Sequence, residues 1–108
     1  MANTFKNAKA KIQATNTTVY TCPSATTAIV LQAQVANVSA TAEEVTVFWE
    51  DTSDSSAVTR FVKDLVIPAG VAIGVLDGKL VLEAGDIIKA IGETNDDAEI
   101  TVSVLEIS

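Results

Sequence analysis

Residues 67–90 alternate short apolar runs with dipeptides that favour tight turns. Ala69-Gly70 and Ala84-Gly85 each lead into an apolar run, and Asp77-Gly78 lies between them. Glycine adopts the positive-φ conformations of tight turns at little steric cost. We therefore expect this segment to fold back on itself within a compact antiparallel sheet.

Period-two alternation dominates the rest of the chain, whereas the spacing of apolar residues typical of an amphipathic helix is nearly absent. One segment alternates apolar residues with other side chains and indicates a half-buried strand. Its apolar positions are Ile29, Leu31, Ala33 and Val35. An earlier alternating segment, residues 8–14, carries lysines between its apolar positions. Further strands are expected at residues 17–22, 45–50, 59–66, 71–76, 79–82, 86–91 and 99–107.

About nine short strands at this spacing predict an all-β protein, a single antiparallel β-sandwich. Jelly-roll and immunoglobulin-like topologies both fit the pattern. At 108 residues the chain is long enough for one core, so we expect one domain. Within it, residues 1–16 form a basic N-terminal arm or edge strand, and residues 17–108 form the sandwich.

The charge is distributed unevenly along the chain. Lys6, Lys9 and Lys11 precede the first acidic residue, Glu43, and the chain as a whole has a net charge of −7. An acidic body repels nucleic acid, and no apolar run is long enough to span a bilayer, so neither partner is expected. The three lysines either dock on an acidic neighbouring subunit or line the solvent-exposed face of an edge strand, where lysine discourages aggregation.

The residues that usually carry chemistry are sparse. The chain has no histidine and one cysteine, Cys22, which we expect to be a half-buried strand residue and not a nucleophile. The adjacent pairs Glu43-Glu44 and Asp96-Asp97 would point to opposite faces of a strand, so we interpret them as surface charge. The loop at residues 51–56 offers oxygen ligands of the kind calcium takes, but it lacks the spacing, the glycine and the bidentate glutamate of an EF-hand, so we interpret it as a solvated turn. We expect no enzyme activity and no cofactor.

One segment indicates a contact surface. Trp49 alternates in phase with Val45 and Val47, which predicts that it packs in the core. Phe48 would then face outward, and an exposed phenylalanine on a sheet face suggests a protein contact. The predicted subunit-contact residues are Phe5, Lys6, Lys9, Lys11 and Phe48.

Residues 17–108 resemble a group of small virion proteins of tailed bacteriophages. The resemblance lies in the order of several segments more than in any single motif. These segments are residues 18–30, 35–38, 63–70, 78–86 and 104–108. The lysine-bearing segment at residues 5–11 lies outside the resemblance.

The resemblance implies a non-enzymatic β-sandwich subunit present in many copies on a virion that assembles in the host cytoplasm. The expected function is capsid decoration, with a neck, tail or fibre accessory protein as the alternative. The expected partners are other copies of the chain and other virion proteins, such as the major capsid protein or neck and tail proteins. A carbohydrate-binding or adhesin-type sandwich is the alternative from another class.

Overall fold

The computed structural model describes residues 2–108, and Met1 lies outside the described part. Most of these residues are in strands, and a short 3-10 turn, η1 (Thr52–Asp54), follows the fourth strand. No helix among the described residues is long and apolar enough to cross a membrane. The strands are β1 (Asn3–Ile12), β2 (Thr17–Thr21), β3 (Thr27–Asn37), β4 (Glu43–Asp51), β5 (Ala57–Ile67), β6 (Ala72–Gly74), β7 (Leu80–Leu82), β8 (Ile87–Gly92) and β9 (Ala98–Ile107).

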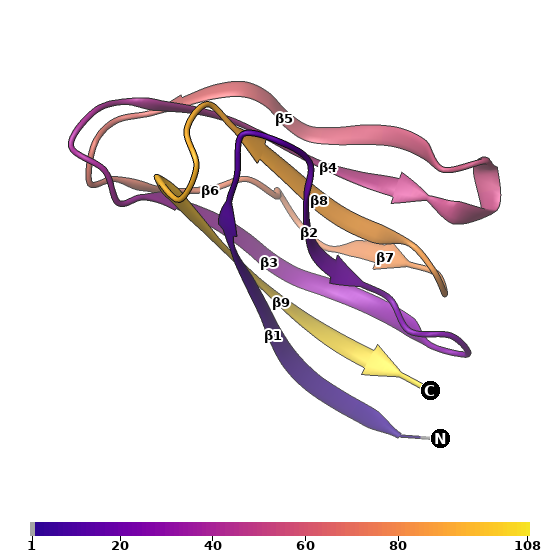
Figure 1. Ribbon diagram of the computed structural model, residues 1–108. Helices are drawn as coiled ribbons and strands as arrows, with labels where there is room; N and C mark the ends of the chain where they lie inside the picture. Colours follow the sequence, from indigo (N-terminus) through magenta and orange to yellow (C-terminus); the bar gives the residue numbers. More distant parts are fainter. Residues whose placement is uncertain (1) are drawn as a thin grey trace.

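The strands form two antiparallel sheets that enclose one core (Figure 1). Sheet A has the order β1-β9-β3-β6, with β7 also paired to β3, and sheet B has the order β2-β8-β4-β5. Strand β1 pairs with β9, β2 with β8, and β4 with β5, while β3 pairs with both β6 and β7. This is the pairing of one long antiparallel hairpin that is rolled up into two layers. That arrangement is a jelly roll. The predicted antiparallel β-sandwich of about nine strands is confirmed, and its topology is the jelly-roll alternative.

Strand β3 departs from the predicted alternation. Its pairing with β9 shifts between Val30 and Gln32, so Leu31 is the extra residue of a β-bulge. The side chains that face the core therefore change phase along the strand. Val30 is fully buried, while Ile29 and Leu31 are half-buried. The prediction that Ile29 and Leu31 share the buried face of Ala33 and Val35 is wrong, because a bulge inserts one residue into one strand only.

The core between the sheets is filled mainly by β-branched residues, as the composition predicts. Tyr20 is the one aromatic residue in the fully packed cluster, and Trp49 packs against that cluster while remaining half-buried. The largest fully buried side chains are Ile12, Ile67, Leu82, Ile88 and Ile100.

The turns predicted in residues 67–90 are present, and they position β6, β7 and β8. Gly70, Gly78 and Gly85 all have positive φ angles, of 74°, 87° and 89°. At Gly85 a side chain would be strained by this angle and would also lie 3.4 Å from the Thr52 side chain. The turn before β8 therefore requires glycine and packs closely against η1.

Candidate functional site

Strand β1 forms one edge of sheet A. It pairs with β9 along its whole length, from Asn3 opposite Ile107 to Ile12 opposite Ala98, without a register shift. Its other side has no strand partner among residues 2–108. Residues 3–12 of the basic N-terminal segment thus lie along the sandwich as an edge strand.

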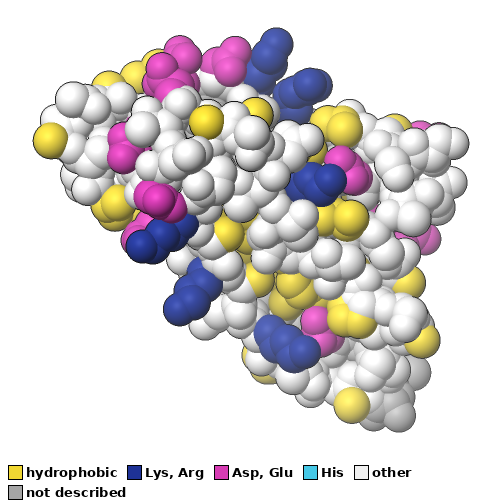
Figure 2. Space-filling model, in the orientation of Figure 1, with side chains coloured by type: hydrophobic (Ala, Val, Ile, Leu, Met, Phe, Trp, Pro, Cys, Tyr) yellow, Lys and Arg dark blue, Asp and Glu magenta, His cyan; other side chains and the backbone are white. Residues whose placement is uncertain are grey.

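The three lysines of β1 point to two sides of sheet A. Lys9 and Lys11 are exposed and alternate with Ala8, Ala10 and Ile12, which turn toward the core. Within residues 2–108, neither Lys9 nor Lys11 forms an ion pair. Basic side chains line the margin of the molecule that β1 occupies in Figure 1, as Figure 2 shows. The strand therefore presents free positive charge beside an open edge.

Lys6 belongs to a network that joins the two sheets. Its Nζ lies 3.1 Å from Oε1 of Glu106 on β9, and the Tyr20 hydroxyl on β2 donates to Glu106 Oε2 at 2.6 Å. The hydrogen bond from Tyr20, together with Lys6, holds the pKa of Glu106 below its usual value despite burial. Burial, and to a smaller extent Glu106, raises the pKa of Tyr20. The network fixes β1 to the sandwich from inside.

An apolar row crosses the outer face of sheet A. Phe5 pairs with Leu105, Leu105 pairs with Ile29, and Ile29 pairs with Val81, so the four side chains share one face on β1, β9, β3 and β7. Phe5 is 73% exposed and Val81 is 57% exposed. A hollow of about 200 Å³ beside Phe5 is lined in part by Leu31, the bulge residue of β3. The row is a continuous apolar strip, exposed at Phe5 and Val81 and half-buried at Leu105 and Ile29.

The next row on the same face is polar. The amide of Gln32 donates to the Ser103 hydroxyl at 3.0 Å, and that hydroxyl donates to Asn7 Oδ1 at 2.6 Å. These bonds tie β1, β9 and β3 together on the outer surface. The face therefore changes from apolar to polar within one row.

Phe48 is placed on the outer face of sheet B, yet it is only 6% exposed. Its cross-strand neighbours are Arg60 on β5 and Lys89 on β8, and Lys89 is held by Glu50 at 3.0 Å. Long side chains cover apolar surface with their methylene stems while their charges stay in water. The prediction that Phe48 is exposed is wrong for this reason, and Phe48 offers little area for a contact.

Glu43 also differs from its predicted place on the surface, since it is only 2% exposed. Its Oε2 accepts hydrogen bonds from the backbone N–H groups of Glu93 at 3.1 Å and Thr94 at 3.0 Å. A Cβ atom at Gly92 would lie 3.0 Å from the same oxygen. The carboxylate fixes the loop between β8 and β9, which the alternation of the sequence does not reveal.

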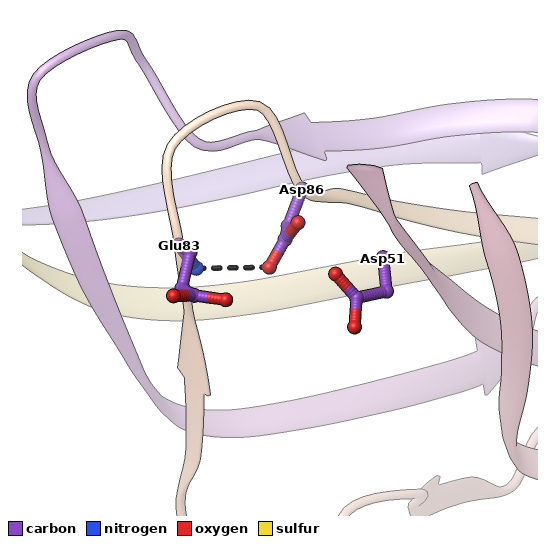
Figure 3. Close-up of side chains that lie close together, drawn as sticks. All are labelled: Asp51, Glu83 and Asp86. Atoms are coloured by element: carbon purple, nitrogen blue, oxygen red, sulfur yellow. Dashed lines mark hydrogen bonds between the residues drawn. The ribbon is translucent and has the colours of Figure 1, made fainter. Parts of the chain in front are cut away.

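The carboxylates of Asp51, Glu83 and Asp86 lie close together at one end of the sandwich, with oxygens within 4.8 Å of one another (Figure 3). Asp86 is 1% exposed, and its two oxygens accept hydrogen bonds from the backbone N–H groups of Thr52 at 3.0 Å and Glu83 at 2.9 Å. Of the side-chain oxygens in the loop at residues 51–56, only those of Asp51 belong to this carboxylate cluster. The bonds to Asp86 give the cluster a structural role in holding η1 against the turn before β8.

Cys22 follows β2 and is buried, more completely than the sequence indicates. Its thiol donates to the Thr26 carbonyl oxygen at 3.3 Å. Burial raises the pKa of the thiol, with smaller contributions of the same sign from Asp86 and Glu106. A buried thiol of raised pKa is a packing residue and a poor nucleophile.

The surface row also contains residues that no sequence pattern marks: Leu105, Ile29 and Val81. Their row depends on the register between strands that lie far apart in the sequence, so no local pattern marks it. Glu106 is different, because it continues the inward-facing alternation of Val102 and Val104. A carboxylate at a position that should be buried is a signal that could have identified it.

Comparison with known proteins shows a likeness of fold. No family model matches the chain, and no curated protein matches it. A solved structure described as "Bacillus endospore appendages form a novel family of disulfide-linked pili" is similar, with a TM-score of 0.59 and 11% sequence identity. The match covers 99% of this chain and 87% of that chain. At this identity the likeness shows a common fold and no more.

Proposed function

We propose that the chain is a non-enzymatic structural subunit used in many copies on the virion of a tailed phage, with capsid decoration as its role. The observation that carries the proposal is the outer face of sheet A beside the open edge of β1. There the apolar row from Phe5 to Val81 begins on β1, whose outer edge has no strand partner among residues 2–108. Uncovered apolar surface and open strand edges both favour contact with another protein.

Two likenesses agree with an assembled state. Residues 17–108 resemble small virion proteins in the order of their segments, and a protein of similar fold belongs to a family of pili. A neck, tail or fibre accessory protein remains the alternative position in the virion. In each case the partners are copies of the chain and neighbouring virion proteins.

The buried polar groups support a structural role. Glu43 and Asp86 bind backbone N–H groups, and Glu106 binds Tyr20 and Lys6. No buried side-chain nitrogen or oxygen among the described residues is without a hydrogen-bond partner. Carboxylates engaged in this way hold loops and strands, which leaves them poorly placed to act on a substrate.

The assembly would be non-covalent. Cys22 is the single cysteine of the chain and is 1% exposed. A disulfide between copies would require the end of β2 to open. Contacts between subunits would therefore rest on sheet surfaces and edges.

Mass spectrometry of purified particles tests the proposal. We expect the protein in every particle, in hundreds of copies for capsid decoration or in a small multiple of three or six for a neck, tail or fibre position. Phe5→Asp should reduce incorporation, whereas Val66→Asp, at an exposed valine on β5, should not. Absence of the wild-type protein from the particles would refute the proposal.

A hollow on the outer face of sheet B favours the second candidate, a carbohydrate-binding module. It measures about 340 Å³ and is lined by Phe48, Glu50 and Arg60 among others. Sugar rings stack on exposed aromatic faces, and Phe48 exposes too little for this, so the candidate ranks second. A glycan array tests it with wild type and Arg60→Ala, and binding to no glycan would remove it.

A further inference from the structure

The four edges of the two sheets are protected to different degrees. On sheet A, the edge opposite β1 consists of β6 and β7, which are three residues each. On sheet B, β2 is five residues long and has a register shift. Strand β5 is long, but its pairing with β4 shifts twice and Asp64 has a φ of 50°. Short strands, bulges and local twist all hinder pairing at an edge.

Strand β1 has none of these features. Its ten residues pair with β9 in one unbroken register and contain neither proline nor glycine. Lysines are its main protection, and Lys6 is already bound to Glu106. Of the four edges, β1 is therefore the one that is both long and regular.

The backbone groups that β1 presents follow from its pairing with β9. Ala2 and Ser108 exchange two hydrogen bonds of 3.0 Å, which makes them a hydrogen-bonded pair of the antiparallel ladder. Such pairs recur at every second residue, so the even-numbered residues of β1 bind β9. The N–H and C=O groups that face the open edge belong to Asn3, Phe5, Asn7, Lys9 and Lys11. Of these, the Lys11 C=O already accepts a hydrogen bond from the Gln13 side-chain amide at 3.1 Å.

We propose that β1 pairs with β1 of a second copy in antiparallel orientation, which joins the two A sheets across a twofold axis. The pattern of donors and acceptors on the open edge is self-complementary under such an axis. Pairing along the strand would form about eight to ten hydrogen bonds, close to the number found in a typical protein interface. This inference deepens the proposed role as an assembly subunit and rests on it.

The positions of the lysines restrict the register. Side chains directly opposite one another share a face, and like charges in that position are destabilising. An axis at Lys6 or Lys9 would set that lysine against its own copy, and an axis nearer either end of β1 would shorten the overlap of the two strands. Two registers remain. An axis at Asn7 sets Lys9 opposite Phe5 of the second copy, and an axis at Ala8 sets Lys11 there instead. Both of these registers let a lysine stem cover the exposed ring of Phe5.

The charge of β1 gives the proposal a distinct salt dependence. Two lysine-bearing strands repel each other, and added salt screens that repulsion. Dimerisation should therefore strengthen as salt rises, whereas docking of β1 on an acidic surface would weaken. Sedimentation equilibrium of the full chain at two salt concentrations measures this. A monomer throughout the micromolar range, or a dimer that weakens with salt, would overturn the proposal.

A proline variant tests the edge itself. Lys9→Pro removes an N–H that faces the open edge and leaves the bonds to β9 intact, so the fold should survive. Dimerisation should weaken about tenfold or more, because each copy loses a donor. The matched control Lys9→Gln keeps the N–H and removes a charge, so it should dimerise at least as well as wild type. Equal dimerisation of Lys9→Pro, with its folding confirmed by circular dichroism, would contradict the pairing.

Single cysteines test the register independently of stability. In the two allowed registers, Asn7→Cys or Ala8→Cys places the two thiols directly opposite, within the Cα separation that a disulfide needs. Cys22 is buried and does not compete. We expect a covalent dimer from one of these variants and none from Val66→Cys on β5. Cross-linking only at position 66 would overturn the pairing of β1 with β1. The proposed role in the virion would be decided separately, by the presence or absence of the protein in purified particles.

Discussion

The outer faces of the two sheets each carry one phenylalanine, Phe5 on sheet A and Phe48 on sheet B. Phe5 is 73% exposed, whereas Phe48 is 6% exposed. Phe48 lies on β4, between β5 and β8, with a long basic side chain opposite it on each side. Phe5 lies on an edge strand and has a cross-strand neighbour, Leu105, on one side only.

The difference teaches that cover on an outer face depends on position in the sheet more than on residue type. A central strand gives each outward side chain two flanking neighbours, and long side chains there close over an aromatic ring. On an edge strand an outward side chain has a neighbour on one side only, so its other side is covered only when a partner molecule binds. The uncovered ring therefore marks the side of the sandwich from which we expect assembly.

The largest expected difference in stability is between variants that remove one ring or the other. Phe48→Ala should lower the free energy of unfolding by about 3 kcal/mol, because it leaves a cavity under Arg60 and Lys89. Phe5→Ala should change it by no more than about 0.5 kcal/mol in the isolated subunit. Urea denaturation of both variants measures the contrast. Equal losses would mean that the two faces are covered alike.

Although its outer edge is open, β1 is held from inside the sandwich by the contacts of Glu106 with Lys6 and Tyr20. Glu106→Ala should cost about 1–3 kcal/mol, because the buried Tyr20 hydroxyl loses its acceptor. Since folding lowers the pKa of Glu106, its stabilisation is present above the usual glutamate value of about 4.3 and is lost as pH falls through the folded pKa.

Denaturation across the acid range checks this dependence. Glu106→Gln keeps an acceptor for Tyr20 and cannot ionise, so its stability should vary less with pH than that of wild type. Identical pH profiles for the two proteins would show that ionised Glu106 adds no stability to the folded state, which would contradict the network.

A smaller effect is expected from opening the cover on sheet B. Lys89→Ala removes the stem opposite Phe48 and the ion pair with Glu50, and should cost about 1 kcal/mol. Lys9→Ala, on the outer face of sheet A, is the matched control and should cost almost nothing. Thermal unfolding of both variants compares the two lysines directly.

The smallest effect on stability, and a clear effect on surface character, is expected from Phe5→Asp. The variant should unfold at nearly the wild-type temperature, because the ring is outside the core. It should bind less of a hydrophobic fluorescent dye, since the exposed row loses its largest member. Unchanged dye binding would place the accessible apolar surface elsewhere.

The sequence predicts the sandwich because alternation and turn glycines act locally. Residues 67–90 and the strand at residues 99–107 show these signals clearly, and the structure contains their turns and strands. The alternation fails at Leu31, where the bulge depends on the pairing of β3 with β9. It also gives the wrong exposure for Phe48 and Glu43, whose cover comes from distant parts of the chain.

By itself, then, the sequence determined the fold class, the turns and the basic character of residues 5–11, because each follows from neighbouring residues. Only the tertiary structure decided the jelly-roll order, the row from Phe5 to Val81 and the network of Lys6, Tyr20 and Glu106. Those features join strands that are far apart in the chain. Their register is set by how the whole hairpin rolls up, and no local pattern records it.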